Sequence, residues 1–337
     1  MGEKVVTLGE VMLRLSTPEH ARIIQSTHFE ATYGGGEANV AVSLAQLGLG
    51  AAHVTRLPDN ELGRAAANLL RRYGVDTRHV LYGGERLGVY FLETGASVRP
   101  SKVLYDRGHS AFAGLEPDML DWDEVFAGAG WFHWTGITPA VSAGAAACCA
   151  KAIEAANRRG LTVSADINYR RNLWQYGKTA AEVMPGLIAG CDLIVAGKGD
   201  ARDILGITPG KAAGDELASV FGQITERFPK VRKVLSTARG SLSASHNTLS
   251  GMLWDGARML ETRTYQINPI VDRIGGGDAF MAGFIYGQLA YGDDQRALDF
   301  GVAASVLKHT IREDANLATA QEVEALLAGD TSGRLVR

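Results

Sequence analysis

The sequence predicts an α/β fold in which a mainly parallel sheet is covered by helices on both faces. Short apolar runs alternate with longer amphipathic runs along the whole chain, as expected when buried strands are joined by crossover helices. The 41 glycines fall between these runs and mark many strand–helix turns. No linker or internal repeat interrupts the 337 residues, so we expect one domain over residues 1–337.

Each expected element is bounded by a turn or capping residue. The first strand, 5–8, is mainly apolar and ends at Gly9, and the first two helices end at Gly48 and Gly74. Ser142 caps a long alanine-rich helix that stops at Gly160. The other expected strands are 129–133, 161–167, 192–195 and 233–236. The first two helices are expected at 37–47 and 64–73, and two later ones at 278–291 and 297–309.

Two stretches, about 12–33 and 86–110, depart from this rhythm. Both mix polar and aromatic residues, and 88–93 alternates as a strand with one exposed face does. We expect them to form a small β lid over the ligand edge of the sheet. The exposed edges of such a lid favour a homo-oligomer, a dimer or larger.

Composition excludes several classes of protein. A formal net charge of −3 provides no basic field for nucleic acid and no polybasic membrane patch. No apolar run approaches the length that spans a bilayer, and a strand-like run starts too early for a signal peptide. Cys148, Cys149 and Cys191 lack metal or redox spacing. We interpret them as small buried apolar residues of a cytoplasmic protein.

The most informative segment is 272–283, Asp-Arg-Ile-Gly-Gly-Gly-Asp-Ala-Phe-Met-Ala-Gly. Its three glycines let backbone amides surround a ligand at the start of a helix, where the helix dipole favours an anion. A carboxylate at position 278 repels such an anion unless it has a task, and general-base catalysis on a hydroxyl is one. The alternative is that Asp278 only caps its helix.

A second glycine run, 34–36, also precedes a helix and is followed by Glu37, Ala38 and Asn39. Asn39 offers a donor and an acceptor to a hydroxyl-rich ligand. Two such sites favour a protein that holds two ligands. Neither run has the spacing of a dinucleotide fingerprint or a P-loop.

Polar residues also follow the strand expected at 161–167, in the sequence Asp166, Ile167, Asn168, Tyr169, Arg170. Ligands of open α/β sheets bind beyond the carboxyl ends of strands. Arg170 can therefore bind a substrate carboxylate or stabilise a transferring phosphoryl group, or it is a surface arginine with an acidic neighbour. On the expected lid, an inward-facing Arg107 would be a second carboxylate binder.

Residues 34–39, 166–170 and 274–278, in this order, resemble the ribokinase-like (PfkB) carbohydrate kinases over essentially the whole chain. Further residues at 99–102, 105–107 and 135–140 are most similar to the members that act on 2-keto-3-deoxygluconate. The resemblance implies a ribokinase-like doubly wound fold, ATP with Mg²⁺, and phosphoryl transfer to the terminal hydroxyl of this sugar acid. It leaves open whether the protein also needs a monovalent cation such as K⁺.

The resemblance also assigns roles to residues. Asp278 matches the catalytic base, Gly275, Gly276 and Gly277 match the anion hole, and Arg170 matches a residue that touches the reacting groups. The positions that match the sugar site are Gly34, Gly35, Asn39, Tyr90, Tyr105, Arg107, Asn168, Arg170 and Asp278. The positions that match the nucleotide site are Lys198, Ser236, Thr237, Gly240, Gly275 and Gly277.

One segment departs from the family pattern. Where the family usually carries N-x-x-E, this chain has Gly197-Lys198-Gly199-Asp200. Asp200 then replaces the glutamate that supports the metal, and Lys198 contacts phosphate. Two alternatives to the 2-keto-3-deoxygluconate kinase stay open: another kinase of the family, acting on fructose, ribose or a nucleoside, and a sugar or nucleotide sensor with weak or lost turnover.

Overall fold

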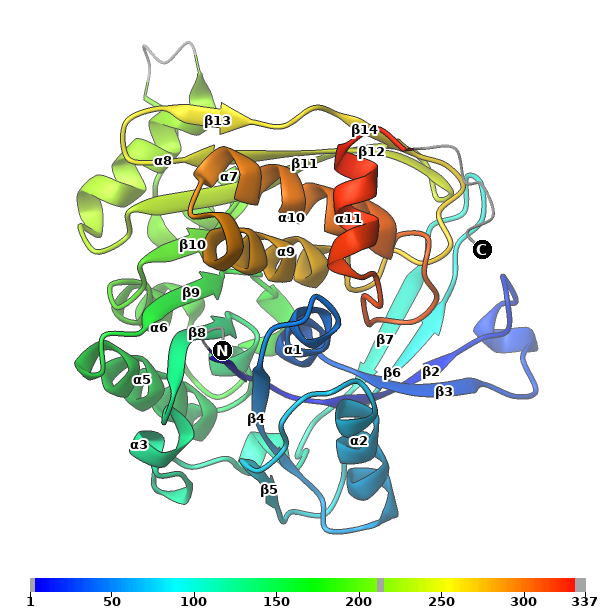
Figure 1. The fold of residues 1–337 in the computed structure, drawn as a ribbon. Coiled ribbons are helices and arrows are strands. Elements are labelled where there is room, and N and C mark those ends of the chain that lie inside the picture. Colours follow the sequence, from blue (N-terminus) through cyan, green and yellow to red (C-terminus); the bar gives the residue numbers. More distant parts are fainter. Residues whose placement is uncertain (1–3, 211–214, 331–337) are drawn as a thin grey trace.

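The computed structural model describes residues 4–210 and 215–330, in which ten strands form a large sheet with helices on both faces (Figure 1). The predicted doubly wound, mainly parallel α/β architecture is confirmed. Neighbouring strands from β5 to β11 are parallel, and β12 to β14 add an antiparallel end. The order is β13 (Met259–Glu261), β12 (His246–Trp254), β11 (Lys233–Ser243), β10 (Leu193–Val195), β9 (Thr162–Asp166), β8 (Ala129–Thr135), β1 (Lys4–Leu8), β4 (Ala51–Leu57) and β5 (Val80–Tyr82); β14 (Tyr265–Ile267) pairs with β12.

The central strands are apolar on both faces, and their side chains divide between two cores. Val6 and Leu8 of β1 point into one core, whereas Val5 points into the other. Helices cover both, which is why these strands read as continuous apolar runs. The first core is closed by α3 (Trp122–Val125), α5 (Ala143–Arg158), α6 (Ala180–Ile188), α7 (Lys198–Leu205) and α8 (Glu216–Arg227). The second is closed by α1 (Gly36–Gln46), α2 (Glu61–Arg72), α9 (Gly276–Tyr291), α10 (Asp294–Lys308) and α11 (Ala320–Leu327).

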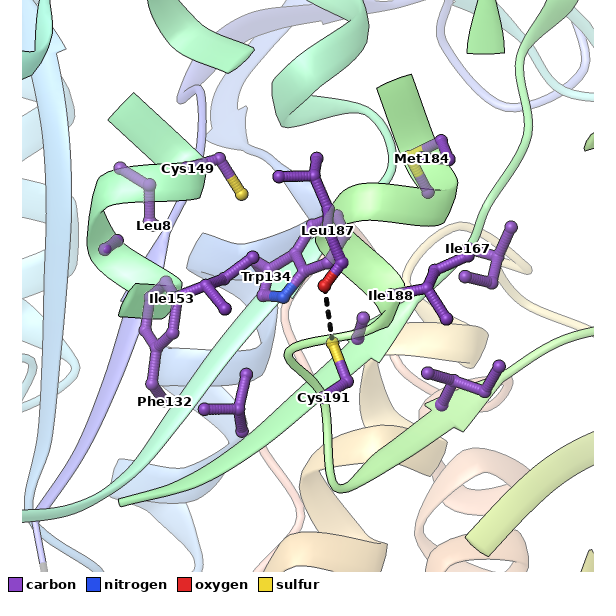
Figure 2. Packing of buried hydrophobic residues seen from close by; sticks show 14 of the residues in the cluster. Leu8, Phe132, Trp134, Cys149, Ile153, Ile167, Met184, Leu187, Ile188 and Cys191 are labelled. Atoms are coloured by element: carbon purple, nitrogen blue, oxygen red, sulfur yellow. Dashed lines mark hydrogen bonds between the residues drawn. The ribbon is translucent and has the colours of Figure 1, made fainter. Parts of the chain in front are cut away.

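Part of the first core contains the cysteines (Figure 2). Cys148 and Cys149 lie on α5, Cys191 follows α6, and all three are free and fully buried. The Sγ of Cys191 donates to the carbonyl of Leu187 at 3.5 Å. Burial raises the pKa of the Cys191 thiol to about 12, which keeps it protonated. The prediction that the cysteines are buried apolar residues is confirmed.

A second sheet of four strands stands beside the main one (Figure 1). Its strands come from the two stretches that break the alternation of the sequence. β2 and β6 are its central, parallel pair, with β3 and β7 antiparallel at the edges. The bounds are β2 (Met12–Ser16), β3 (Glu30–Gly34), β6 (Gly88–Glu93) and β7 (Lys102–Asp106).

The structure corrects several expected boundaries. α2 begins three residues before the expected position 64, because the Asn60 side chain accepts from the amides of Leu62 and Gly63. The strand expected at 233–236 continues to Ser243, where it turns back into β12. Some elements of the structure have no counterpart among the expected ones, namely β4, β5, β12–β14, α3, α6–α8, α11 and the short helix α4 (Thr138–Val141). Among the described residues, no helix combines the length and the hydropathy of a membrane span.

Candidate active site

A cavity of about 370 Å³ lies beyond the carboxyl ends of β8 and β9, where α1 and α9 begin. Its walls come from the main sheet, from the second sheet and from two helix N-termini, as expected for an open α/β fold. Of the predicted site residues, it brings together Gly35, Asn39, Tyr90, Tyr105, Arg107, Asn168, Arg170, Gly275, Gly276, Gly277 and Asp278. Met12, Gly36, Val103, Ile137, Asp166, Arg239, Arg273, Ile274 and Asp314 complete the lining.

Asp278 does not cap its own helix. The N-cap of α9 is Gly275, which has φ 79°, and Asp278 lies in the first turn. Its Oδ2 accepts a hydrogen bond of 2.7 Å from Nδ2 of Asn39 on α1. The carboxylate is therefore held by the other glycine–helix junction, and the simple capping alternative is wrong.

Two carboxylates in the cavity have unusual proton affinities. Burial raises the pKa of Asp278 to about 7, against the opposing hydrogen bond from Asn39. Burial, and then the charge of Asp200, raises the pKa of Asp166 to about 7, although Arg170 lowers it. A carboxylate with a pKa near neutrality is suited to accept a proton from a hydroxyl group.

The glycine run before α9 is shaped by its neighbours. A Cβ at Gly275 would lie 1.9 Å from the Asp314 carbonyl oxygen, and one at Gly276 would lie 2.7 Å from Cε1 of His309. A Cβ at Gly277 would meet no atom within 4 Å, because this residue faces the cavity. The first amides of α9 have no partner within the helix, so those at this face are available to an anion.

Four arginines line the cavity, and they differ in what neutralises them. Arg107 is buried and forms an ion pair with Glu10 through Nη2. Within residues 4–210 and 215–330, Arg170, Arg239 and Arg273 form no ion pair. These three guanidinium groups give the open part of the cavity a positive potential that suits anionic ligands.

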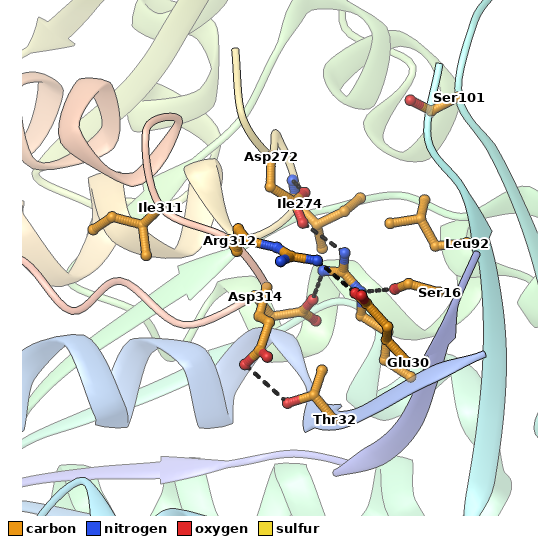
Figure 3. A network of polar contacts seen from close by, with 12 residues as sticks. Ser16, Glu30, Thr32, Leu92, Ser101, Asp272, Ile274, Ile311, Arg312 and Asp314 are labelled. Carbon is orange, nitrogen blue, oxygen red and sulfur yellow. Dashed lines mark hydrogen bonds and ion pairs between the residues drawn. The ribbon is translucent and has the colours of Figure 1, made fainter. Parts of the chain in front are cut away.

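A buried ionic network joins the second sheet to the segment that contains Gly275–Gly277 (Figure 3). Arg14 of β2 contacts Oδ2 of Asp272 at 2.5 Å and also pairs with Asp314. The hydroxyl of Tyr90 on β6 donates to Oδ2 of Asp314 at 2.5 Å. Asp272 precedes the glycine run, and the Asp314 carbonyl lies against Gly275, so the position of the second sheet is coupled to the glycine run. At the edge of this network, Thr32 donates to Glu313 and Arg312 pairs with Glu30.

The other glycine–helix junction is supported by a buried acid, Glu37. Its Oε1 accepts from the Thr135 amide at 3.0 Å and from the hydroxyls of Thr135 and Thr138 at 2.8 and 2.7 Å. Burial raises the pKa of this carboxyl. These bonds fix the start of α1 against the end of β8, and thereby position Asn39.

Six predicted site residues lie outside the cavity lining. The Lys198 ammonium pairs with Glu216 on the surface at 2.7 Å, and Asp200 accepts the Gly197 amide at 2.8 Å. Gly34 is buried at the end of β3, where a Cβ would lie 2.3 Å from Oδ2 of Asp314. Ser236, Thr237 and Gly240 follow one another along β11, the strand that also carries the lining residue Arg239.

The sequence analysis missed the charged residues that support the cavity, namely Glu10, Arg14, Arg239 and Asp314. Arg14 lies in an alternating strand and Asp314 in a polar tail, so each resembles an ordinary exposed residue in the sequence. Only Arg239 carried a usable signal, because it interrupts the predicted nucleotide-site residues Thr237 and Gly240.

Residues 2–318 match the family model described as pfkB family carbohydrate kinase. The chain belongs to the PfkB family of carbohydrate kinases. It is therefore an enzyme that transfers a phosphoryl group to a sugar hydroxyl, as predicted. The family membership accounts for the glycine–helix junction that carries Asp278 and for the ribokinase-like fold.

Two relatives match over nearly their whole length. The 2-dehydro-3-deoxygalactonokinase of Haloferax volcanii is 34% identical over 99% of both chains. The crystal structure of 2-dehydro-3-deoxygluconokinase from Thermotoga maritima is 43% identical, covers 98% of this chain and 99% of its own, and has a TM-score of 0.93. A putative ribokinase II of E. coli in complex with ATP and Mg²⁺ shares the fold at 18% identity and a TM-score of 0.80, with coverage of 97% and 99%. This PfkB kinase is thus similar to kinases named for two epimeric sugar acids.

Proposed function

We propose that this PfkB kinase uses ATP to phosphorylate the terminal hydroxyl of 2-keto-3-deoxy-D-gluconate, giving 2-keto-3-deoxy-6-phosphogluconate. The observation that carries the proposal is the Asp278 carboxylate. It lies in a cavity beside anion-binding amides, it is held by Asn39, and its pKa is about 7. A sugar hydroxyl next to Oδ1 transfers its proton to Asp278 while its oxygen attacks the γ-phosphorus in line with the leaving ADP.

The phosphates meet groups of two kinds. The amides at the start of α9, including that of Gly277, receive the charge that develops on the transferred phosphoryl group. Arg239 and Arg273 line the same cavity, form no ion pair with any residue that the structure describes, and support binding of the triphosphate. Ser236, Thr237 and Gly240 extend this surface along β11 for the rest of the nucleotide. Lys198 would have to leave Glu216 to join them.

The sugar acid fits the remaining wall. Arg170 is exposed to the cavity and has no carboxylate partner among the described residues, so it is the first candidate for the substrate carboxylate. Arg107 is already paired with Glu10, so it binds the substrate carboxylate only if its guanidinium group contacts both carboxylates at once. Asn39, Asn168 and Tyr105 offer hydrogen bonds to the sugar hydroxyls, and Gly35 allows close approach. The second sheet is the lid that covers this sugar.

Mg²⁺ fits the acidic part of the same cavity, at Asp166. Asp166 lines the cavity, and its raised pKa reflects burial beside the Asp200 carboxylate, a repulsion that a bound cation relieves. Protein sites for Mg²⁺ commonly supply one or two carboxylates and leave the rest to phosphate and water. Asp166 would hold the ion directly and Asp200 would support it from behind. When bound, Mg²⁺ neutralises phosphate charge during transfer.

A substrate panel tests the proposal. The purified enzyme, ATP and Mg²⁺ are incubated with 2-keto-3-deoxygluconate, its galacto epimer, fructose or ribose, and ADP release is measured. We expect the highest kcat/KM for 2-keto-3-deoxygluconate and a 6-phosphate product by mass and NMR spectroscopy. Asp278→Asn is the control for contaminating kinases. A higher kcat/KM for the galacto epimer, fructose or ribose would overturn the substrate assignment.

The second candidate is the galacto epimer, because the relative from Haloferax volcanii is named for it. The two acids differ at one hydroxyl, so the panel separates them directly. A sensor without turnover would instead show ligand-induced thermal stabilisation and no ADP release with any sugar. An intact Asp278 with a pKa near 7 argues against that sensor.

A further inference from the structure

Lys308, the last residue of α10, is a lysine with no exposed surface. Its ammonium donates to the carbonyl of Ile311 at 3.1 Å and to the carbonyl of Asp272 at 3.4 Å. A lysine that bonds a carbonyl just beyond its own helix is common. The bond to Asp272 is not local, because it crosses 36 positions to the segment that precedes the catalytic glycines.

The side chain also touches the glycine run itself. A Cβ at Gly275 would lie 3.3 Å from Cε of Lys308, so the lysine stem packs against the N-cap of α9. The same Gly275 position is closed on another side by the Asp314 carbonyl. Lys308 therefore lies between two loops, one before α9 and one after α10, whose carbonyls converge on it.

The formal charges of the buried cluster formed by Arg14, Asp272, Asp314 and Lys308 balance. Asp272 and Asp314 supply two negative charges, and Arg14 and Lys308 supply two positive ones. Asp278 is the other carboxylate that acts on the ammonium. Burial lowers the pKa of Lys308, and these carboxylates oppose that effect. Without the ammonium, the cluster would carry a net negative charge beside the place where ATP phosphates are expected to bind.

We infer that the Lys308 ammonium is a built-in monovalent cation that holds the Gly275–Gly277 loop in its anion-binding form. The inference rests on the proposed function in one respect, since it assigns this loop to phosphoryl transfer. Lys308 is a positioning residue: it reaches the phosphate through the loop carbonyls and through the balance of charge. The enzyme therefore requires no added K⁺, because an ammonium on a tether already bonds the carbonyls that a free cation would bind.

The first measurement needs no variant. The kcat of the wild-type enzyme is compared in K⁺, NH₄⁺, Na⁺ and tetramethylammonium salts at matched ionic strength. We expect the same kcat in all four. A wild-type enzyme that is activated by K⁺ or NH₄⁺ over Na⁺ would overturn the inference, whether or not any variant folds.

The second measurement uses Lys308→Met, which keeps the length of the stem and removes the charge. In Na⁺ we expect kcat to fall by about 10²-fold, the scale seen when an oxyanion-stabilising group is lost, with the KM for the sugar little changed. K⁺ and NH₄⁺ should restore part of kcat, which a merely structural lysine would not predict. Lys233→Met is the matched control, because Lys233 contacts Asp294 of α10 away from the cavity; its kcat should stay at the wild-type value in every salt.

Thermal melting separates this inference from the proposed function. The Tm of Lys308→Met, without sugar, should rise more in K⁺ than in Na⁺, whereas the Tm of the wild type and of Lys233→Met should not. That difference holds whichever sugar is the substrate, so failure of the substrate panel leaves this test intact. A Lys308→Met enzyme with wild-type kcat in Na⁺, or with loss of kcat that no cation restores, would reject the built-in cation.

Discussion

The side-chain amide of Asn39 donates a 2.7 Å hydrogen bond to the carboxylate of Asp278, although the two residues lie 239 positions apart. Each belongs to a helix that follows a glycine run, and α1 packs against α9 in the second core. The bond therefore joins the predicted sugar site to the predicted phosphate site. It also orients one carboxylate oxygen toward α1 and leaves the other for a ligand.

The first prediction concerns Asp278, the proposed base. Asp278→Asn preserves the shape of the side chain and its ability to accept from Asn39, but it cannot take a proton. We expect kcat to fall by about 10²–10⁴-fold while ATP and the sugar acid still bind. Steady-state ADP release and isothermal titration calorimetry check the two parts. Undiminished turnover would show that another group removes the proton.

The second prediction is a pH profile. The active form of Asp278 is the carboxylate, and burial raises its pKa in the free enzyme to about 7. We expect kcat/KM, which reports the free enzyme, to rise about tenfold per pH unit below about pH 7 and to level off above it. Asp166→Asn should move this limb to lower pH, because the Asp166 charge helps to raise the pKa of Asp278. If kcat/KM instead rose and levelled off near pH 4, a group other than Asp278 would be the base.

The third prediction links the same group to stability. The folded pKa of Asp278 lies above that of an unfolded aspartate, so the free energy of unfolding falls as pH rises through that interval. Removing the charge should therefore stabilise the fold progressively as pH rises above the unfolded pKa, and fully above the folded pKa. We expect Asp278→Asn to gain about 1–3 kcal/mol at about pH 8 and nothing at about pH 4. Urea denaturation at both pH values measures the free energy of unfolding. A lower value for Asp278→Asn than for the wild type at both pH values would contradict the prediction.

An element of the fold or site can be predicted from the sequence when the residues that reveal it are neighbours in the chain. β1 is recognisable because its apolar run is bounded by Gly9, and the Gly275–Gly277 loop because three glycines precede an aspartate. β12 was missed since its burial alternates through small polar residues such as Asn247 and Ser250, which resemble a loop in the sequence. A sheet end that packs on one face gives a weaker apolar pattern than a buried parallel strand.

The charged supports of the site were missed for a different reason. Arg14 becomes buried only because Asp272 and Asp314, 258 and 300 positions away, meet it there. No local pattern distinguishes such an arginine from a solvated one, because burial of a charge depends on its partner. The sequence thus predicts most of the residues that line the cavity but not the buried charges that support them.

The fourth prediction contrasts two arginines of the cavity. Arg170 is exposed, and among the described residues its guanidinium group makes one weak hydrogen bond, to the Tyr169 carbonyl at 3.5 Å. Arg170→Ala should leave the Tm unchanged and raise the KM for the sugar acid by about 10-fold or more, through loss of a charge-assisted bond. Neutral sugars, if accepted, should show no such rise, and equal effects on both would remove Arg170 from carboxylate recognition.

Arg107 should behave differently because Glu10 depends on it. Arg107→Ala leaves a buried carboxylate unpaired, so we expect a loss of about 3–5 kcal/mol in the free energy of unfolding. Adding Glu10→Gln should recover much of that loss. If the double variant has a raised KM for the sugar acid but not for neutral sugars, Arg107 also binds the substrate carboxylate.

The last prediction uses two neighbouring glycines as each other's control. Gly275 has φ 79°, and a Cβ there would lie 1.9 Å from the Asp314 carbonyl. Gly275→Ala should therefore destabilise the fold by about 2 kcal/mol or more. Gly277 lies within α9, and a Cβ would meet nothing within 4 Å, so Gly277→Ala should keep or slightly raise the Tm.

Activity then separates the roles of these glycines. The new methyl group at position 277 would face the cavity where the amides are expected to meet phosphate. We expect Gly277→Ala to raise the KM for ATP and to lower kcat while the protein remains fully folded. Wild-type kinetics in a folded Gly277→Ala variant would mean that the transferred phosphoryl group binds away from the start of α9.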